Sequence, residues 1–329
     1  MAAQMFRVAS ISLASRRENI AQNVVDVAKR LAQASRDKIS LAVFPEHCLV
    51  GYGSMAALRR NELDALAEPL DGPSIKAVAK AVERAGVAAG VGFIERASDG
   101  RLFNSYVVCM PGGLHHCHRK LHASEHRRIS SGDRLTVFDA PNGVRIGILI
   151  GEDNCLVENA RMLALMGTML LVAPQRNRLA RDTTQPGSME GCDAGGSSAQ
   201  RSVCDEGMAP RRNWLQSRAA DNGMFVVSSE GVEAGDDPGR FGTGMLIDPY
   251  GTVLAQCVDA RDDLVAADLD LRLIRRSPGH RWLAARRPEL YGSLSQSADH
   301  VPRVESGAVR SKGSIAVSFA QVARGRLPG

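Results

Sequence analysis

Acidic side chains follow two predicted buried strands of this 329-residue chain. Segments 39–44 and 144–150 are short, mainly apolar runs, and such runs are typical of strands that are covered on both faces. Glu46 lies just beyond the first segment, and Glu152 and Asp153 lie just beyond the second. In layered α/β folds, ligand crevices open at the carboxyl ends of the strands. We therefore expect these three carboxylates to border a pocket.

Glu125 could join them, so that up to four carboxylates surround one pocket. Like charges held close together raise the pKa of at least one of them toward neutrality. Such a group could activate a water molecule directly or bind a cationic ligand. The alternative is that Asp153 makes structural hydrogen bonds and that Glu152 faces solvent or pairs with an arginine.

The elements that would position these residues alternate between strand and helix. Residues 144–174 predict a strand, a sharp turn, a helix that ends near Gly167 and a second strand. Near the N-terminus, a strand at 6–13 precedes a helix at 17–34, for which Ser15 is the predicted N-cap. Further strands are predicted at 87–95, 102–110, 136–138, 224–229, 252–257 and 264–270, and further helices at 55–67, 74–85 and 212–220. This alternation is typical of an α/β domain.

The segment 144–174 also carries an ordered set of residues: Gly147, Ile150, Asp153, Glu158, Arg161, Leu163, Ala164 and Gly167. In this order it resembles the nucleophile elbow of the nitrilase (carbon–nitrogen hydrolase) superfamily. That superfamily carries its catalytic cysteine at the position of Gly151 and an aromatic residue at the position of Glu152. The resemblance therefore implies an elbow whose nucleophile is missing.

Other segments resemble the same superfamily in the same order along the chain: Pro45-Glu46, Arg119-Lys120, residues 219–223, residues 242–251 and residues 286–291. The resemblance implies that Glu46 is the general base, that Lys120 is the catalytic lysine, and that Glu125 helps to position substrate and lysine. The substrate-binding residues that we predict are Tyr52, Glu152 and Asp153. The implied fold is a four-layer αββα sandwich, in which each of two mixed sheets is covered by helices on its outer face.

The chemistry of this superfamily needs a thiolate that attacks a nitrile or amide carbon, a carboxylate that moves protons, and a cation that stabilises the developing negative charge. Glycine at position 151 cannot supply the first of these groups. Cys155 is an alternative nucleophile at the start of the following helix, where the helix N-terminus lowers the pKa of a thiol. The other interpretation of Cys155 is an ordinary half-buried thiol.

A group of histidines surrounds the predicted catalytic lysine: His115, His116, His118 and His122. They do not form a ligand set with an obvious fourth partner, so we predict no metal centre. We interpret residues 115–122 as a solvated loop with one histidine packed near Lys120. No cofactor is predicted.

Composition limits the class of protein. Seven cysteines without a CxxC pair argue against a disulfide framework and a zinc ribbon, and a net charge of +5 without a basic stripe argues against nucleic-acid binding. No apolar run approaches the roughly 18 residues that span a bilayer, and the N-terminus has no export signal, so we expect no membrane association and a cytoplasmic location. We expect a domain at 1–292, with a pocket loop at 176–209, and a C-terminal tail at 293–329. The expected partners are a small-molecule substrate or ligand and, by the resemblance, further copies of the chain in a homodimer or larger even oligomer.

Two functions follow from these residues. The first is an enzyme that acts on a small amide, nitrile or related C–N compound through a Glu/Lys pocket without the usual cysteine. The second is a non-catalytic ligand-binding or regulatory homologue, or an inactivated Cys-to-Gly variant of an amidase or nitrilase.

Overall fold

The computed structural model describes residues 6–51, 55–176, 213–233, 244–257 and 264–296. The chain divides into two compact units, residues 1–286 and 287–329. The described part of the second unit contains the 3-10 helices η3 (Pro288–Leu290) and η4 (Gly292–Ser295). Tyr52, the predicted pocket loop from residue 177 onward and the predicted tail from residue 297 onward lie outside the described residues.

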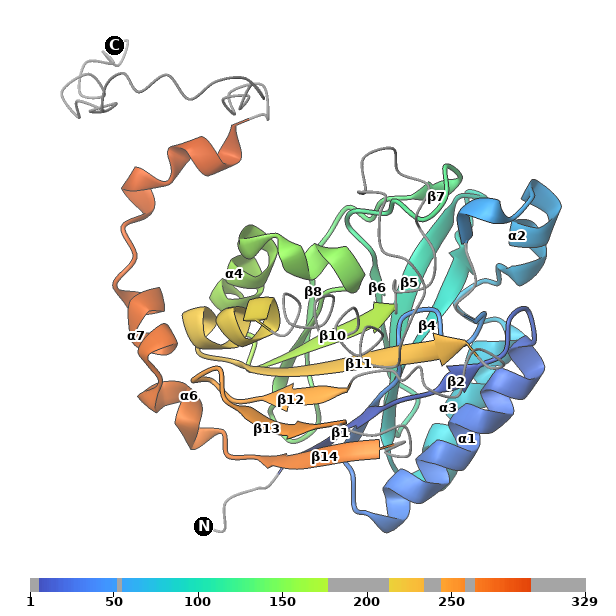
Figure 1. Ribbon diagram of the computed structural model, residues 1–329, viewed down its shortest axis with the longest axis horizontal. Coiled ribbons are helices and arrows are strands. Elements are labelled where there is room, and N and C mark those ends of the chain that lie inside the picture. Colours follow the sequence, from blue (N-terminus) through green and yellow to red (C-terminus); the bar gives the residue numbers. More distant parts are fainter. Residues whose placement is uncertain (1–5, 52–54, 177–212, 234–243, 258–263, 297–329) are drawn as a thin grey trace, which may run out of the picture. The chain divides into compact units, whose positions relative to one another are not determined.

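The first unit contains two mixed sheets (Figure 1). The strands of the first sheet are β1 (Phe6–Ile11), β3 (Leu41–Val43), β4 (Ala88–Arg96), β5 (Leu102–Cys109), β6 (His115–Arg119), β7 (Ile129–Ser130) and β14 (Leu264–Leu269). They follow the order β14-β1-β3-β4-β5-β6, with β7 beside β5. The central strands β1, β3 and β4 are parallel, with Val8 opposite Leu41 and Leu41 opposite Ala88.

The strands of the second sheet are β2 (Ala14–Ser15), β8 (Thr136–Asp139), β9 (Arg145–Ile148), β10 (Leu170–Arg176), β11 (Phe225–Glu233), β12 (Met245–Ile247) and β13 (Val253–Gln256). They follow the order β13-β12-β11-β10-β9-β8, with β2 beside β11. The strands β9, β10 and β11 are parallel, so their carboxyl ends lie at one edge of the sheet.

Apolar side chains on alternate positions of the strands build the layers. Val8 and Leu41 of the first sheet share one buried cluster with Ile148 and Val172 of the second, and this cluster joins the two sheets face to face. Ala9, one residue along from Val8, belongs instead to a cluster shared with the helices on the outer face. The four-layer αββα sandwich predicted from the resemblance is confirmed.

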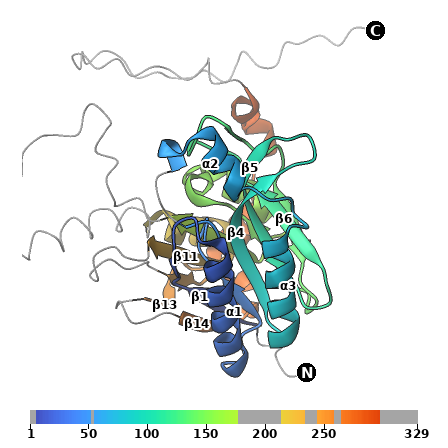
Figure 2. The same ribbon diagram turned by 90° about the vertical axis from the view of Figure 1, so that its right-hand side faces the viewer.

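The helices α1 (Ile20–Arg36) and α3 (Pro73–Ala85) cover the first sheet (Figure 2). The second sheet is covered by α4 (Val157–Leu165) and by a helix over 213–222. In α1 the buried residues Val27, Leu31 and Ala34 repeat at helical spacing, which explains why this segment packs as an amphipathic helix.

Ser15 was predicted as the N-cap of this first helix, and that prediction is wrong. The N-cap is Asn19, whose side chain accepts a hydrogen bond from the backbone N–H of Gln22 at 3.2 Å. Ser15 is buried in β2 and donates its hydroxyl to the carbonyl of Cys48 at 2.7 Å. The chain pairs with β11 before it turns into the helix, and the sequence pattern does not reveal this pairing.

Two further sequence predictions need correction. The predicted helix at 55–67 is divided into η1 (Met55–Ala57) and α2 (Arg60–Leu66), because the side chain of Glu62 accepts a hydrogen bond from the backbone N–H of Arg59 at 2.7 Å and so fixes a new helix start. Residues 115–119 of the predicted histidine loop form strand β6, paired with β5. Within the described residues, no helix combines the length and apolarity that crossing a bilayer requires.

Candidate active site

Gly151 lies at the start of a 3-10 helix, η2 (Gly151–Cys155), that follows β9. Its φ of +54° is a left-handed backbone conformation, which glycine adopts without a steric penalty. A Cβ atom at this position would lie 2.7 Å from Oε2 of Glu46 and 3.0 Å from Nζ of Lys120. A side chain at residue 151 would therefore project onto a carboxylate and an ammonium group.

Lys120 follows β6 directly, and it is 1% exposed. Its Nζ donates to Oε1 of Glu46 at 3.1 Å, to Oε1 of Glu125, and to Oε2 of Glu152 at 2.5 Å. Burial disfavours the ammonium form, but these three carboxylates outweigh it and raise the pKa of Lys120 above its ordinary value. The lysine therefore stays charged throughout the physiological pH range.

Asn104 joins the two buried glutamates, and our sequence analysis did not single it out. Its Nδ2 donates to Oε1 of Glu46 at 2.7 Å and to Oε1 of Glu125 at 2.8 Å. The residue is 1% exposed and lies on β5, a strand that is buried along its whole length. The available signal was an amide side chain within that buried, mainly apolar strand, since buried amides are nearly always hydrogen-bonded.

Glu125 is a buried carboxylate that is tied to its own loop as well as to the lysine. Its Oε2 accepts a hydrogen bond from the backbone N–H of Ser124 at 3.0 Å. Burial would raise the pKa of Glu125, but the charge of Lys120 more than offsets this effect and holds the pKa well below its ordinary value of 4.5. Glu125 is therefore ionised at neutral pH.

This shift predicts how acid destabilises the site. A carboxyl group whose folded-state pKa is lowered contributes stability above its unfolded-state pKa, and that contribution is lost as the pH falls through the folded-state pKa. We expect Glu125→Gln to lower the free energy of unfolding by roughly 2 kcal/mol at pH 6. The difference from wild type should shrink steadily below about pH 4.5. Chemical denaturation of both proteins from pH 6 to pH 2.5 measures it, and a constant difference over this range would contradict the assignment.

Glu152, one residue after Gly151, is the most exposed of the carboxylates on Lys120. Its side chain is 33% exposed, whereas those of Glu46 and Glu125 are each 2% exposed. Glu152 pairs with the ammonium group of Lys120, a contact that neither of the considered alternatives included. Its predicted role in substrate binding stays a prediction.

Asp153 has the contacts of a structural residue. It is fully buried, and it accepts hydrogen bonds from the backbone N–H groups of Leu121 and His122 at 2.8 and 2.9 Å. Oδ1 of Asp153 also lies 2.8 Å from Nδ1 of His122. Burial raises the pKa of Asp153, and these contacts partly offset that effect. These contacts favour the structural alternative to the predicted substrate-binding role, since they fix the segment directly after Lys120.

Cys155, the alternative nucleophile, lies at the end of η2, and its side chain is exposed. Its backbone carbonyl accepts a hydrogen bond from Arg218 at 2.9 Å. Among the described residues, Cys155 is not a hydrogen-bonding partner of Glu46 or Lys120. Its use as a nucleophile remains a prediction.

His47 is the second residue that our sequence analysis did not assign to the site. Its ring is fully buried, and neither ring nitrogen has a hydrogen-bond partner among the described residues. Burial lowers the pKa of His47, although the neighbouring Glu46 and Glu125 act in the opposite direction. The ring is therefore neutral at physiological pH.

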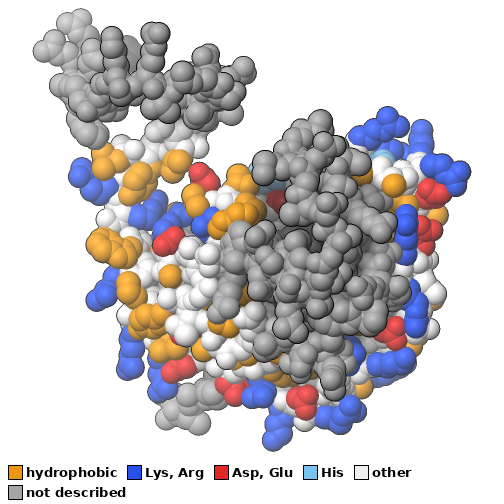
Figure 3. All heavy atoms as spheres, in the orientation of Figure 1, with side chains coloured by type: hydrophobic (Ala, Val, Ile, Leu, Met, Phe, Trp, Pro, Cys, Tyr) orange, Lys and Arg blue, Asp and Glu red, His pale blue; other side chains and the backbone are white. Residues whose placement is uncertain are grey.

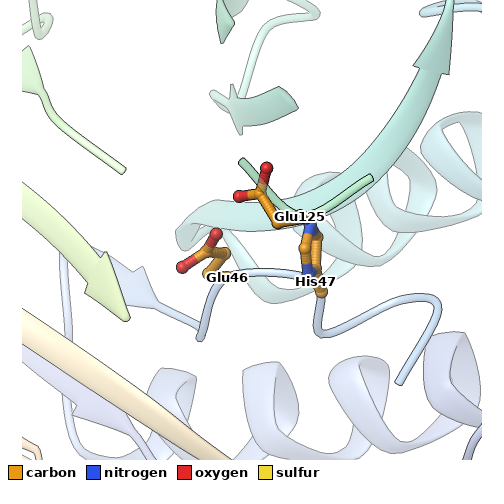
Figure 4. A group of neighbouring side chains, drawn as sticks. All are labelled: Glu46, His47 and Glu125. Atoms are coloured by element: carbon orange, nitrogen blue, oxygen red, sulfur yellow. The ribbon is translucent and has the colours of Figure 1, made fainter. Parts of the chain in front are cut away.

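Figure 4 shows His47, Glu46 and Glu125 beside one another. One potential ligand atom from each of these residues lies within 4.8 Å of the others, so they are the described residues that could hold a metal ion. However, Lys120 already donates to both carboxylates. A metal ion at this place would have to compete with the buried ammonium group.

Two of the predicted cluster's histidines are held away from the carboxylates by β6. Nδ1 of His118 lies 3.1 Å from the hydroxyl of Thr136, and burial lowers the pKa of this buried histidine to about 4. His116 stacks on Phe138 with ring centroids 4.0 Å apart. The prediction of a solvated histidine loop is therefore wrong for these two residues, because β6 pairs with β5 and packs near β8.

The geometry thus places a buried carboxylate (Glu46), a buried ammonium group (Lys120) and the glycine that begins η2 at the carboxyl ends of strands from two sheets. A family model described as carbon–nitrogen hydrolase matches residues 7–278. The chain belongs to the carbon–nitrogen hydrolase family. The match covers most of the first compact unit, so the family assignment predicted from the resemblance is confirmed.

Relatives of this carbon–nitrogen hydrolase family member include amidases. The chain is 32% identical over 300 residues to an (R)-stereoselective amidase of a Pseudomonas species, which covers 89% of this chain and 96% of that protein. The solved structure of a carbon–nitrogen hydrolase from Helicobacter pylori G27 matches with a TM-score of 0.72 and 18% identity, covering 90% of this chain and 99% of that one.

A second solved structure is a Glu-to-Gln mutant of the amidase from Nesterenkonia sp. AN1. It matches with a TM-score of 0.63 and 17% identity, covering 89% of this chain and 98% of that one. That mutant shows covalent addition of the acetamide moiety of fluoroacetamide at its active-site cysteine. At such low identity, these two structural matches support the shared fold.

Proposed function

We propose that this protein hydrolyses a small amide, nitrile or related C–N compound by adding water directly, without a thiol nucleophile. The observation that carries the proposal is the position of Gly151, where a Cβ atom would point at Glu46 and Lys120. The Nesterenkonia amidase uses a cysteine for covalent addition. We infer that Gly151 occupies the equivalent place, so that a water molecule can take the position of the absent side chain.

For an amide, each proton then has a defined route. The Glu46 carboxylate takes a proton from the water molecule, and the resulting hydroxide adds to the carbonyl carbon of the amide. Lys120 stabilises the negative charge that develops on the carbonyl oxygen. Glu46 returns its proton to the amide nitrogen, the C–N bond breaks, and the products are a carboxylic acid and ammonia. Asn104 and Glu125 hold Glu46 and Lys120 in place during these steps.

The competing proposal is a non-catalytic protein that binds a ligand in the same pocket. It is favoured by the absence of a side chain at Gly151 and by the three carboxylates that already accept hydrogen bonds from Lys120. An inactivated variant of an amidase or nitrilase gives the same expectation.

Ammonia release from a panel of small amides and nitriles separates the two proposals. We expect slow release by the wild-type protein, and Glu46→Gln should lower the rate by about 10²-fold, because general-base catalysis contributes this much or more. Intact-mass spectra during turnover should show no acyl adduct. Glu46→Gln purified in parallel also reports the activity of contaminating hydrolases. Equal release by both proteins would favour the ligand-binding proposal, and an adduct on Cys155 would refute direct water attack.

We also propose the cytoplasmic homodimer, or larger even oligomer, that we predicted from the sequence. Figure 3 shows hydrophobic side chains at the surface over α4. The exposed apolar residues of α4 and of the 213–222 helix are Val157 (53% exposed), Met162 (47%), Leu165 (40%) and Trp214 (45%). Such a group of large apolar side chains is typical of a protein–protein interface.

The oligomer is tested by light scattering after size-exclusion chromatography. Wild type should elute with at least twice the chain mass of 35.2 kDa. Met162→Glu should shift the population toward the monomer, because it would place a charge within an apolar interface. Val25→Glu is the matched control, since Val25 is similarly exposed (47%) on α1, across the sandwich from α4. A monomeric wild type, or equal shifts by both variants, would reject this interface.

A further inference from the structure

The hydrogen-bond donors of Lys120 are fully used in the structure. A lysine ammonium has three N–H donors and no acceptor. Lys120 donates them to Glu46 at 3.1 Å, to Glu125, and to Glu152 at 2.5 Å. An oxygen atom of a ligand can therefore bind to Lys120 only if one of these carboxylates leaves.

Two of the three carboxylates are fixed. Glu46 and Glu125 are each 2% exposed, and Asn104 donates to both of them at 2.7 and 2.8 Å. Glu125 also accepts from the backbone of Ser124. If either lost the ammonium, a charged group would remain buried without its counter-ion, which costs several kcal/mol.

Glu152 differs from them in its exposure. Its side chain is 33% exposed, so its carboxylate reaches water, and moving it off Lys120 costs less desolvation than moving a carboxylate that is 2% exposed. It also lies on the short 3-10 helix η2, next to Gly151, whose missing side chain faces Lys120. Among the three partners, Glu152 is therefore the one that a ligand oxygen can replace.

We propose that Glu152 is an internal competing ligand of Lys120, which the oxygen atom of a substrate must displace. The inference rests on the proposed role of Lys120 as the group that binds the substrate oxygen. A neutral carbonyl oxygen is a weaker acceptor than the carboxylate that it replaces. The oxyanion formed during hydrolysis carries a full negative charge, as the displaced carboxylate of Glu152 does. The cost of displacing Glu152 is the same for any ligand oxygen, and an anionic oxygen offsets it better than a neutral carbonyl oxygen because it binds the ammonium group more strongly.

The proposal predicts which molecules bind when Glu152 is removed. We expect Glu152→Ala to bind acetate about tenfold more tightly than wild type, because acetate carries the same charged group as the lost side chain. The affinity for propionamide should also rise severalfold in Glu152→Ala. Glu152→Gln should show the same direction for both probes, because its side chain has the same size but accepts hydrogen bonds less strongly. Isothermal titration calorimetry or ligand-observed NMR measures both dissociation constants.

Glu158→Gln is the matched control. It removes one exposed carboxylate from the first turn of α4, and it should change neither affinity by more than about twofold. Ammonia is followed in the same samples, so that hydrolysis is scored separately from binding. Tighter binding without ammonia would uphold the competition and reject the hydrolase. Ammonia release together with unchanged dissociation constants in folded Glu152→Ala would uphold the hydrolase and reject the competition by Glu152. A gain in Glu152→Ala that is absent from Glu152→Gln would show obstruction by size and overturn the proposal.

Discussion

Gly151→Cys is expected to raise the rate of amide hydrolysis by about 10³-fold or more. In a serine hydrolase, loss of the nucleophile cost about 10⁶ in turnover, so restoring one should recover a large part of such a factor. The recovery stays incomplete because a non-glycine residue at φ +54° costs about 1–3 kcal/mol, and because a Cβ atom would meet Oε2 of Glu46 at 2.7 Å. The measurement is kcat/KM for the amides of the panel, together with intact mass.

The covalent step gives this variant a second readout. Glu46 would take the proton of the thiol, and the thiolate would add to the carbonyl carbon. Glu46 would return that proton to the nitrogen as ammonia leaves, and a thioester would remain until water hydrolyses it. Gly151→Ala is the matched control, since it introduces the same Cβ atom and the same backbone strain without sulfur. If the cysteine and alanine variants were equally slow and neither formed an adduct, residue 151 would not be a nucleophile position.

Lys120→Met is expected to lower the free energy of unfolding by about 3–5 kcal/mol at pH 8, because it leaves the Glu46 and Glu125 carboxylates buried without their cation. The charge of Lys120 holds the pKa of Glu125 low, so removal of the cation raises the folded-state pKa of Glu125. A group with a raised folded-state pKa takes up a proton on folding, so stability recovers as the pH falls. The loss should therefore be smaller at pH 5 than at pH 8, as measured by denaturant titration at both values.

The control for this variant is Lys76→Met. Lys76 is exposed on α3, and its 3.7 Å pair with Asp71 is solvated on both sides. Surface pairs of this kind contribute about 0–1 kcal/mol, so this substitution should change stability little at either pH. If the free energy of unfolding fell by similar amounts in the two methionine variants, the charge of Lys120 would not stabilise the carboxylates around it.

Part of the candidate site follows from the sequence because each residue lies at the end of a recognisable element. Glu46 follows the apolar run of β3, and Gly151 follows that of β9. Such runs are readable because burial on both faces demands continuous apolar residues. The pairing of Lys120 with Glu152 was not predictable in this way. It depends on where one flexible side chain points across two sheets.

Asn104 and Ser15 illustrate the same limit in different ways. Asn104 is one polar residue in a buried strand, and its role depends on two glutamates that lie 58 and 21 residues away in the chain. Ser15 has the local signature of a helix N-cap, but strand pairing with β11 uses its backbone first. A local preference of about 1 kcal/mol is easily outweighed by tertiary contacts.

The sequence by itself determined the alternation of strands and helices, the αββα class and the family, because these depend on apolar periodicity and on motifs whose order is visible along the chain. The tertiary structure alone decided which partner each charged side chain has. It paired Glu152 with Lys120, and it buried Asp153 against the backbone of Leu121 and His122. It also oriented the backbone of Gly151 so that a Cβ atom there would point at Glu46. The reason is that electrostatic partners are selected by distance and burial, and residues far apart in the sequence acquire both only when the two sheets pack together.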